Sequence, residues 1–113
     1  MQEKELVRFE STGDVRRVLV ARGDEGLRVR QEVNGPSAVV AYGEEWHTLE
    51  LGFDRQGTDA LDEALWVSGG VESLLRTGDA DVVDLMDLCD REGIAYTYRS
   101  DGPESGPQLR PAD

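Results

Sequence analysis

The stretch VRRVLVARGDEGLRVRQEV, residues 15–33, decides the fold. Its first half, 15–23, is rich in β-branched residues, and the linker GDEG at 23–26 carries the glycines that a tight turn needs. The second half alternates apolar and polar side chains with the period of two that marks a half-buried strand. One face of that strand carries Leu27, Val29, Gln31 and Val33. The stretch therefore predicts a β-hairpin.

Similar patterns flank this hairpin on both sides. Residues 6–9 and 37–43 (SAVVAYG) are short apolar runs of the kind found in strands, and 45–53 (EWHTLELGF) alternates again. The segments NGPS at 34–37 and GEE at 43–45 supply turn residues between these runs. We therefore expect an antiparallel meander of four to five strands, with 37–43 among its central strands.

The periodicity changes to that of helices after residue 57. Thr58 suits the N-cap of a first helix, because Asp59 and Asp62 then lie in or near its positive first turn. The segment SGG at 68–70 interrupts it, and a second short helix then ends at Gly78. We expect both helices to pack their apolar stripes against the sheet.

A third helix and a last strand complete the prediction. Asp79 suits the N-cap of the third helix, Gly93 its left-handed C-cap, and Ile94 is placed to fold back on Cys89. Residues 94–99 alternate as a strand, and the Gly- and Pro-rich segment 100–113 predicts a flexible C-terminal tail. Strands, then helices, then one strand indicate an α+β fold in a single domain, residues 1–99, with two to three short helices on one face of the sheet.

The net charge limits what the protein binds. The 113 residues include 24 acidic and 12 basic residues, a net charge of -12, and residues 35–113 account for all of it. Phosphates would be repelled, which argues against direct binding of nucleic acid or an anionic membrane. The excess of acidic residues favours a protein partner with a basic surface.

Cysteine content and hydropathy narrow the class further. With one cysteine, Cys89, the chain forms no intrachain disulfide and no thiol zinc cluster, and we expect no cofactor. The charged N-terminus lacks the apolar core of a signal peptide. No stretch has the roughly 18 apolar residues of a membrane span, so we expect a cytoplasmic protein.

The third helix carries a row of acidic residues opposite its apolar side, namely Asp81, Asp84, Asp87 and Asp90. A spacing of three spreads the carboxylates over the whole outer face, whereas a calcium loop curls its ligands around one point. The row is therefore a plain solvated face or a phosphate-like field for a basic partner. In the second case Trp66, beside Asp59 and Asp62, would be an apolar anchor.

His47 is the only histidine, so any hydrolytic dyad or triad needs it. Cys89 as nucleophile with His47 as base is a formal alternative, but Cys89 falls on the apolar side of its helix. His47 with Tyr42 and Tyr96 would also line a small pocket at an aromatic end of the sheet. No glycine-rich phosphate-binding motif precedes a helix.

The leading hypothesis is a small, acidic, non-enzymatic protein that binds another protein and occludes its basic or nucleic-acid-binding surface. Phage anti-defence proteins, such as inhibitors of CRISPR systems, and immunity proteins that neutralise nucleases have this character. The composition also allows a homodimer. One alternative is a ligand-binding or enzymatic domain that uses His47, Tyr42 and Tyr96. Another is salt adaptation, which would spread the acids evenly over the surface.

Overall fold

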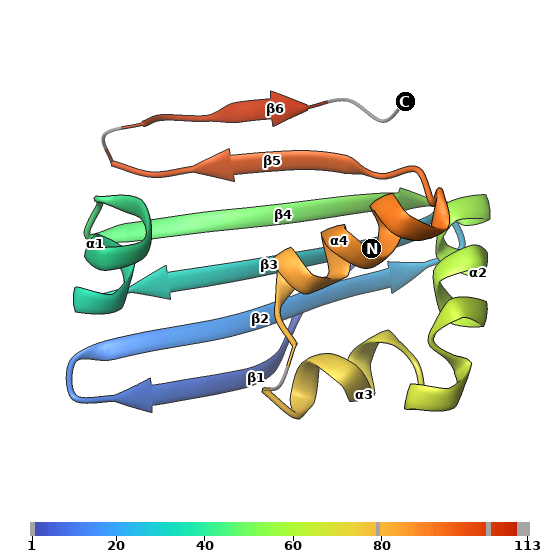
Figure 1. The fold of residues 1–113 in the computed structure, drawn as a ribbon, viewed down its shortest axis with the longest axis horizontal. Coiled ribbons are helices and arrows are strands. Elements are labelled where there is room, and N and C mark those ends of the chain that lie inside the picture. Colours follow the sequence, from blue (N-terminus) through green and yellow to red (C-terminus); the bar gives the residue numbers. More distant parts are fainter. Residues whose placement is uncertain (1, 79, 104, 111–113) are drawn as a thin grey trace.

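The computed structural model describes residues 2–78, 80–103 and 105–110, and it has an α+β fold (Figure 1). Antiparallel strands pair in chain order, with β5 as the neighbour of β4 and β6 outside β5. The strands are β1 (Lys4–Ser11), β2 (Asp14–Gly23), β3 (Gly26–Asn34), β4 (Trp46–Asp54), β5 (Thr97–Asp101) and β6 (Gln108–Arg110). The helices are α1 (Pro36–Tyr42), α2 (Arg55–Ala64), the 3-10 turn η1 (Trp66–Ser68), α3 (Val71–Arg76) and α4 (Val82–Glu92). The predicted meander with helices on one face is confirmed.

The hairpin of residues 15–33 forms as its alternation predicts. β2 and β3 pair from Val15 opposite Asn34 to Gly23 opposite Gly26. The register then places Leu27 opposite Phe53 and Val29 opposite Leu51 on β4. Because side chains alternate along each strand, this register gathers the apolar residues of all three strands on one face.

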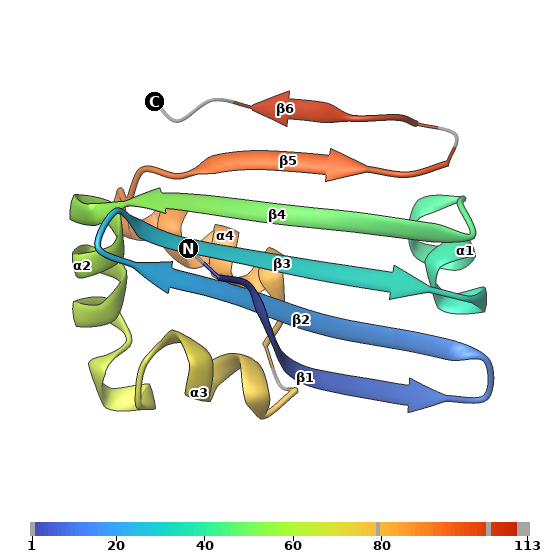
Figure 2. The same cartoon turned by 180° about the vertical axis from the view of Figure 1, so that it is seen from behind.

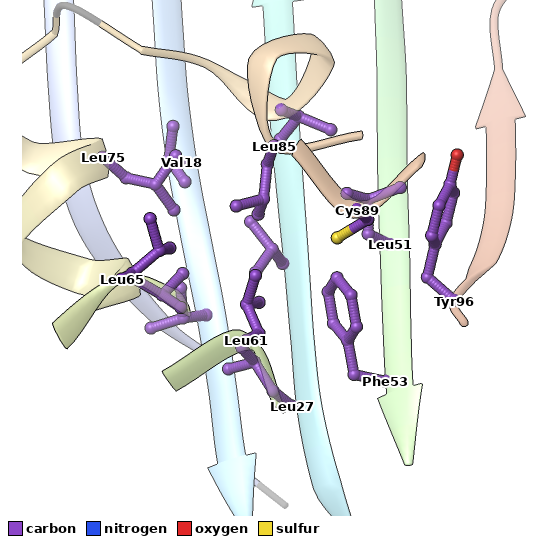
Figure 3. Close-up of a cluster of buried hydrophobic side chains, with 14 of the residues drawn as sticks. Val18, Leu27, Leu51, Phe53, Leu61, Leu65, Leu75, Leu85, Cys89 and Tyr96 are labelled. Carbon is purple, nitrogen blue, oxygen red and sulfur yellow. The ribbon is translucent and has the colours of Figure 1, made fainter. Parts of the chain in front are cut away.

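The core lies between that face and the helices (Figure 3). The helices contribute Leu61, Leu65, Leu75, Leu85 and Cys89, and the strands contribute Val18, Val20, Leu27, Val29, Leu51 and Phe53. Burying one such leucine stabilises the fold by about 1.5–3 kcal/mol relative to leaving it exposed. We call this side of the molecule the helix side, and the other face of the sheet the open face.

The open face is charged, and four of its arginines pair with glutamates. Figure 2 shows the N-terminal residues crossing it over β2 and β3, where Glu3 meets Arg30 at 2.6 Å. The other arginine–glutamate pairs are Arg8–Glu5 (3.1 Å), Arg17–Glu32 (3.0 Å) and Arg28–Glu50 (3.3 Å). Each of these pairs neutralises one positive charge of the open face.

The prediction of a strand at 37–43 is wrong, because this segment forms α1. A contiguous apolar run has no period, so it does not distinguish a buried strand from a short helix. The flanking residues decide: Pro36 occupies the first helical position, and Gly43 ends the helix with φ 74°. β3 pairs directly with β4, so α1 is the connection between two neighbouring strands.

Two helix starts also differ from the prediction. α2 begins three residues before Thr58, and Asp54 caps it by accepting the Gly57 N–H at 2.7 Å. The cap of α4 is Asp81, while the predicted cap, Asp79, lies outside the described residues. Gly93 ends α4 with φ 70° as predicted, and the Ile94 N–H donates to the Cys89 carbonyl at 2.9 Å.

The C-terminal strand starts later and extends further than residues 94–99. β5 runs to Asp101, and β6 pairs with it, Gln108 lying opposite Ser100. The sheet thus reaches into the segment 100–113. The flexibility of that segment stays a prediction, and its residues 104 and 111–113 lie outside the described residues.

Candidate functional site

The first two aspartates of the acidic row hold the N-terminus of α4. Asp81 accepts the Asp84 N–H at 3.1 Å, and Asp84 accepts the Asp81 N–H at 2.9 Å, which forms a reciprocal capping box. Val82, at the first helical position, is fully buried, and its N–H donates to the Gln31 side chain at 3.3 Å. Asp81 and Asp84 therefore have a structural use, although Asp84 remains exposed.

The last two aspartates differ from each other. Asp90 accepts a hydrogen bond from the Tyr96 hydroxyl at 2.8 Å. Asp87 is exposed, and within the described residues it has no hydrogen bond or ion pair. Arg91, the nearest base in sequence, lies 3.8 Å from Glu92 instead. Asp87 is thus the carboxylate of this row with no structural role.

Negative charge gathers on the helix side. Residues 55–93, which contain α2, α3 and α4, hold ten acidic and three basic residues and so carry -7 of the net -12. Within the described part of the chain, five acids there have no ion pair with arginine or lysine: Glu63, Asp81, Asp84, Asp87 and Asp90. The acids are therefore not spread evenly, and this side has an unbalanced negative field.

Trp66 and Val67 form an exposed apolar patch beside these acids, which we call the corner patch. Their exposed fractions are 81% and 97%. Leu65, one residue earlier, is buried, and Gly69 reverses the chain with φ 84°, so the two side chains between them face solvent. The sequence made Trp66 a candidate anchor but left open whether its side chain is exposed, and it did not single out Val67.

An arginine from β2 is inserted between the acids of the corner. The Arg22 guanidinium lies 2.9 Å from Asp62 and 2.8 Å from Glu72. These hydrogen bonds raise the pKa of Arg22 and lower the pKa of Glu72. Trp66 and this trio line a hollow of about 490 Å³ together with Gly69 and Gly70. Asp59 is exposed and pairs with Arg55 at 3.4 Å.

The residues of the alternative, aromatic site do not come together. His47 stacks on Tyr42 with ring centroids 4.1 Å apart, and its Nδ1 lies 2.8 Å from the Glu44 carboxylate. Tyr96 instead packs near Phe53, at the other end of β4, with centroids 6.2 Å apart. Glu44 and His47 are both buried, and Ser105 donates to the same carboxylate. In the structure, the Glu44 carboxylate thus binds both His47 and Ser105.

Cys89 lacks the properties of a nucleophile. Its side chain is fully buried in the core, and burial, with the nearby Asp90 charge, raises the pKa of its thiol to about 11. The reactive species is the thiolate, which this environment disfavours. Among residues 2–78, 80–103 and 105–110, no three His, Cys, Asp or Glu side chains are arranged to hold a metal ion.

Comparisons of the chain with protein-family models, with curated proteins and with solved structures found no match. In the described part of the chain, no helix has the length and apolar character to cross a membrane. The surface chemistry is therefore the basis for a functional proposal.

Proposed function

We propose that this is a small, non-enzymatic cytoplasmic protein that binds another protein through its helix side. The main observation in support of this proposal is the unbalanced negative charge of residues 55–93 beside the exposed Trp66 and Val67. A tryptophan ringed by charges is a common anchor in protein interfaces, because the ring is desolvated on binding while the charges fix its register.

The partner carries a basic surface, in the simplest case one that binds nucleic acid. Carboxylates on neighbouring helical turns lie about 5–6 Å apart, a spacing that offers cationic side chains a phosphate-like row. Occupying such a surface excludes nucleic acid from it. Phage anti-defence inhibitors, including inhibitors of CRISPR systems, and immunity proteins for nucleases act in this general way.

The proposed contact residues differ in whether they also support the fold. Asp87 and Trp66 are the most informative to substitute, since neither supports the fold through a described hydrogen bond. Asp84 and Asp90 contribute charge while capping α4 and holding Tyr96. Asp59 and Asp62 are already paired with arginines, so they contribute less field to a partner.

The test combines affinity capture with two charge-matched variants. Wild type, Asp87→Lys, Glu25→Lys and Trp66→Ala are used to capture proteins from host and prey lysates at low and high salt. Glu25 is an exposed residue of the β2–β3 turn, so its reversal makes the same net-charge change outside the acidic row of α4. We expect a salt-sensitive partner that Asp87→Lys and Trp66→Ala lose and Glu25→Lys retains, the charge reversal acting mainly through the association rate.

The captured partner is then assayed for nucleic-acid binding with and without the protein. Inhibition by wild type and not by Asp87→Lys would support occlusion. A partner that both charge variants bind equally would contradict the helix-side surface. Capture of no partner at either salt would favour salt adaptation.

A further inference from the structure

A second exposed apolar patch lies on and beside α1, at the opposite end of the sheet from the β2–β3 turn (Figure 1). Its members are Val39, Val40 and Trp46, with exposed fractions of 49%, 89% and 36%. We call it the α1 patch. α1 has one buried residue, Ala38, so most of its apolar surface faces solvent.

The charge around the α1 patch is unusually low for this chain. Residues 33–43 form a run of eleven residues without a charged side chain, the longest in the sequence. The exposed Glu45 is the one acid among the residues that line the hollow next to the patch. A basic partner would find little attraction here, in contrast to the helix side.

The low charge of the α1 patch favours contact between two copies of this chain. In a twofold dimer each residue of the patch faces the same patch on the other copy, so any net charge there repels itself. Two copies that each carry -12 repel, and the repulsion is smallest when the approaching surfaces are uncharged.

The shape of the patch also suits a self-contact. Val40 protrudes next to a shallow hollow of about 600 Å³ lined by Asn34, Gly35, Pro36, Val39, Val40 and Glu45. A twofold operator places the protruding side chain of each copy against the hollow of the other. The low charge and the hollow beside Val40 are thus the two features of this surface that favour a self-contact.

The patch is preformed by hydrogen bonds. Asp14 accepts from both the N–H and the hydroxyl of Ser37 at 2.7 Å, which ties the start of α1 to the β1–β2 turn. The Gly35 N–H donates to the Glu45 carbonyl at 2.9 Å. Little conformational entropy is lost when such a surface binds.

We propose that a second copy of this chain docks on the α1 patch, giving a twofold homodimer. The dimer leaves the helix-side acids and the corner patch outside the contact. The proposal does not depend on the proposed function, because it concerns another surface and another kind of partner.

Analytical ultracentrifugation of purified protein over a wide concentration series tests the dimer. Val40→Asp is the disrupting variant, and Val67→Asp is the control, since both put one carboxylate on a highly exposed valine. We expect wild type and Val67→Asp to dimerise alike and Val40→Asp to dimerise about tenfold more weakly or worse, because its carboxylate is buried in the contact. Circular dichroism checks that all three are folded.

Salt and cross-linking give two independent readouts. Dimerisation should strengthen with salt, since screening reduces the repulsion between two acidic copies. Val40→Cys should cross-link to itself with a short bis-maleimide, whereas wild type, with only the buried Cys89, and Val67→Cys should not. A monomer at every concentration, or a dimer that Val40→Asp leaves intact, would overturn the proposal.

Discussion

The corner patch and the α1 patch are both exposed and apolar, but their surroundings differ. Trp66 and Val67 stand among the acids of α2, α3 and α4, whereas Val39 and Val40 stand in a run of eleven uncharged residues. Exposure alone therefore does not identify a partner. The neighbouring charge does: the first patch suits a basic protein and the second suits a copy of itself.

The two patches are also supported differently. The corner patch directly follows the buried Leu65, and Leu61 on α2 is also buried. The α1 patch rests on one buried alanine and on hydrogen bonds that the Asp14 carboxylate and the Glu45 carbonyl accept. Core substitutions should therefore disturb the corner patch most, while polar substitutions should disturb the α1 patch.

The largest effect is expected from Leu61→Ala, directly below the corner patch. Leu61 is fully buried, so its truncation leaves a cavity and should lower the free energy of unfolding by about 2–5 kcal/mol. Chemical denaturation measures this loss. Val67→Ala, at the 97% exposed neighbour, should change it by less than about 0.5 kcal/mol. Equal effects of the two substitutions would show that α2 does not pack as described.

Arg22→Gln should produce the next largest effect. It removes the guanidinium that Asp62 and Glu72 share, and the remaining carboxylates then repel each other. Because these side chains are partly exposed, we expect a loss of about 1–2 kcal/mol in urea denaturation. Arg55→Gln, which breaks an exposed helical pair, should cost about 0.3–0.5 kcal/mol.

The same Arg22 variant also sharpens the comparison of the patches. It makes the corner more negative and leaves α1 unchanged. Binding of a basic partner should therefore strengthen, while self-association should weaken only by the small amount expected from one unit of net charge far from the contact. Surface plasmon resonance and ultracentrifugation would measure the two separately. A change in self-association of the folded variant as large as that in partner binding would mean that the surfaces are not independent.

The sheet could be predicted because its signal is local. The alternation at 27–33 and 45–53 fixes which side chains face the core, and it holds in the structure. α1 could not be read from its apolar run, although Pro36 at the first helical position and Gly43 at the end were available signals. The spacing Asp81-x-x-Asp84 was likewise a readable capping box.

The candidate site was predictable in part. The acidic row follows from the helical period, which also places Trp66 away from the Leu61/Leu65 stripe. The sequence left open whether Trp66 is exposed, and the structure shows that it is. The partner of Asp62 does not, because Arg22 lies 40 residues away and only the packing of α2 on the sheet brings the two together. Which carboxylates stay unpaired is a property of tertiary structure.

Acid should loosen the α1 patch through Asp14. The two hydrogen bonds from Ser37 lower the pKa of the Asp14 carboxyl below its ordinary value, so the unfolded chain binds a proton first as the pH falls. The stabilisation by Asp14 is thus present above the unfolded-state pKa, about 3.9, and is lost as the pH falls through the lower folded-state pKa. In denaturation measured against pH, Asp14→Asn should be less stable than wild type at neutral pH and approach it in acid. A constant gap would contradict this.

The smallest expected effect concerns the single acid beside the α1 hollow. Glu45→Gln removes the charge that faces its own copy across the twofold contact, so dimerisation should strengthen by about two- to threefold. Glu25→Gln, on the turn at the far end of the sheet, makes the same change in net charge and should have a smaller effect. Sedimentation equilibrium at low salt measures both, and high salt should remove the difference. If both variants strengthened the dimer equally, the repulsion would come from the whole charge of the molecule and Glu45 would lie outside the contact.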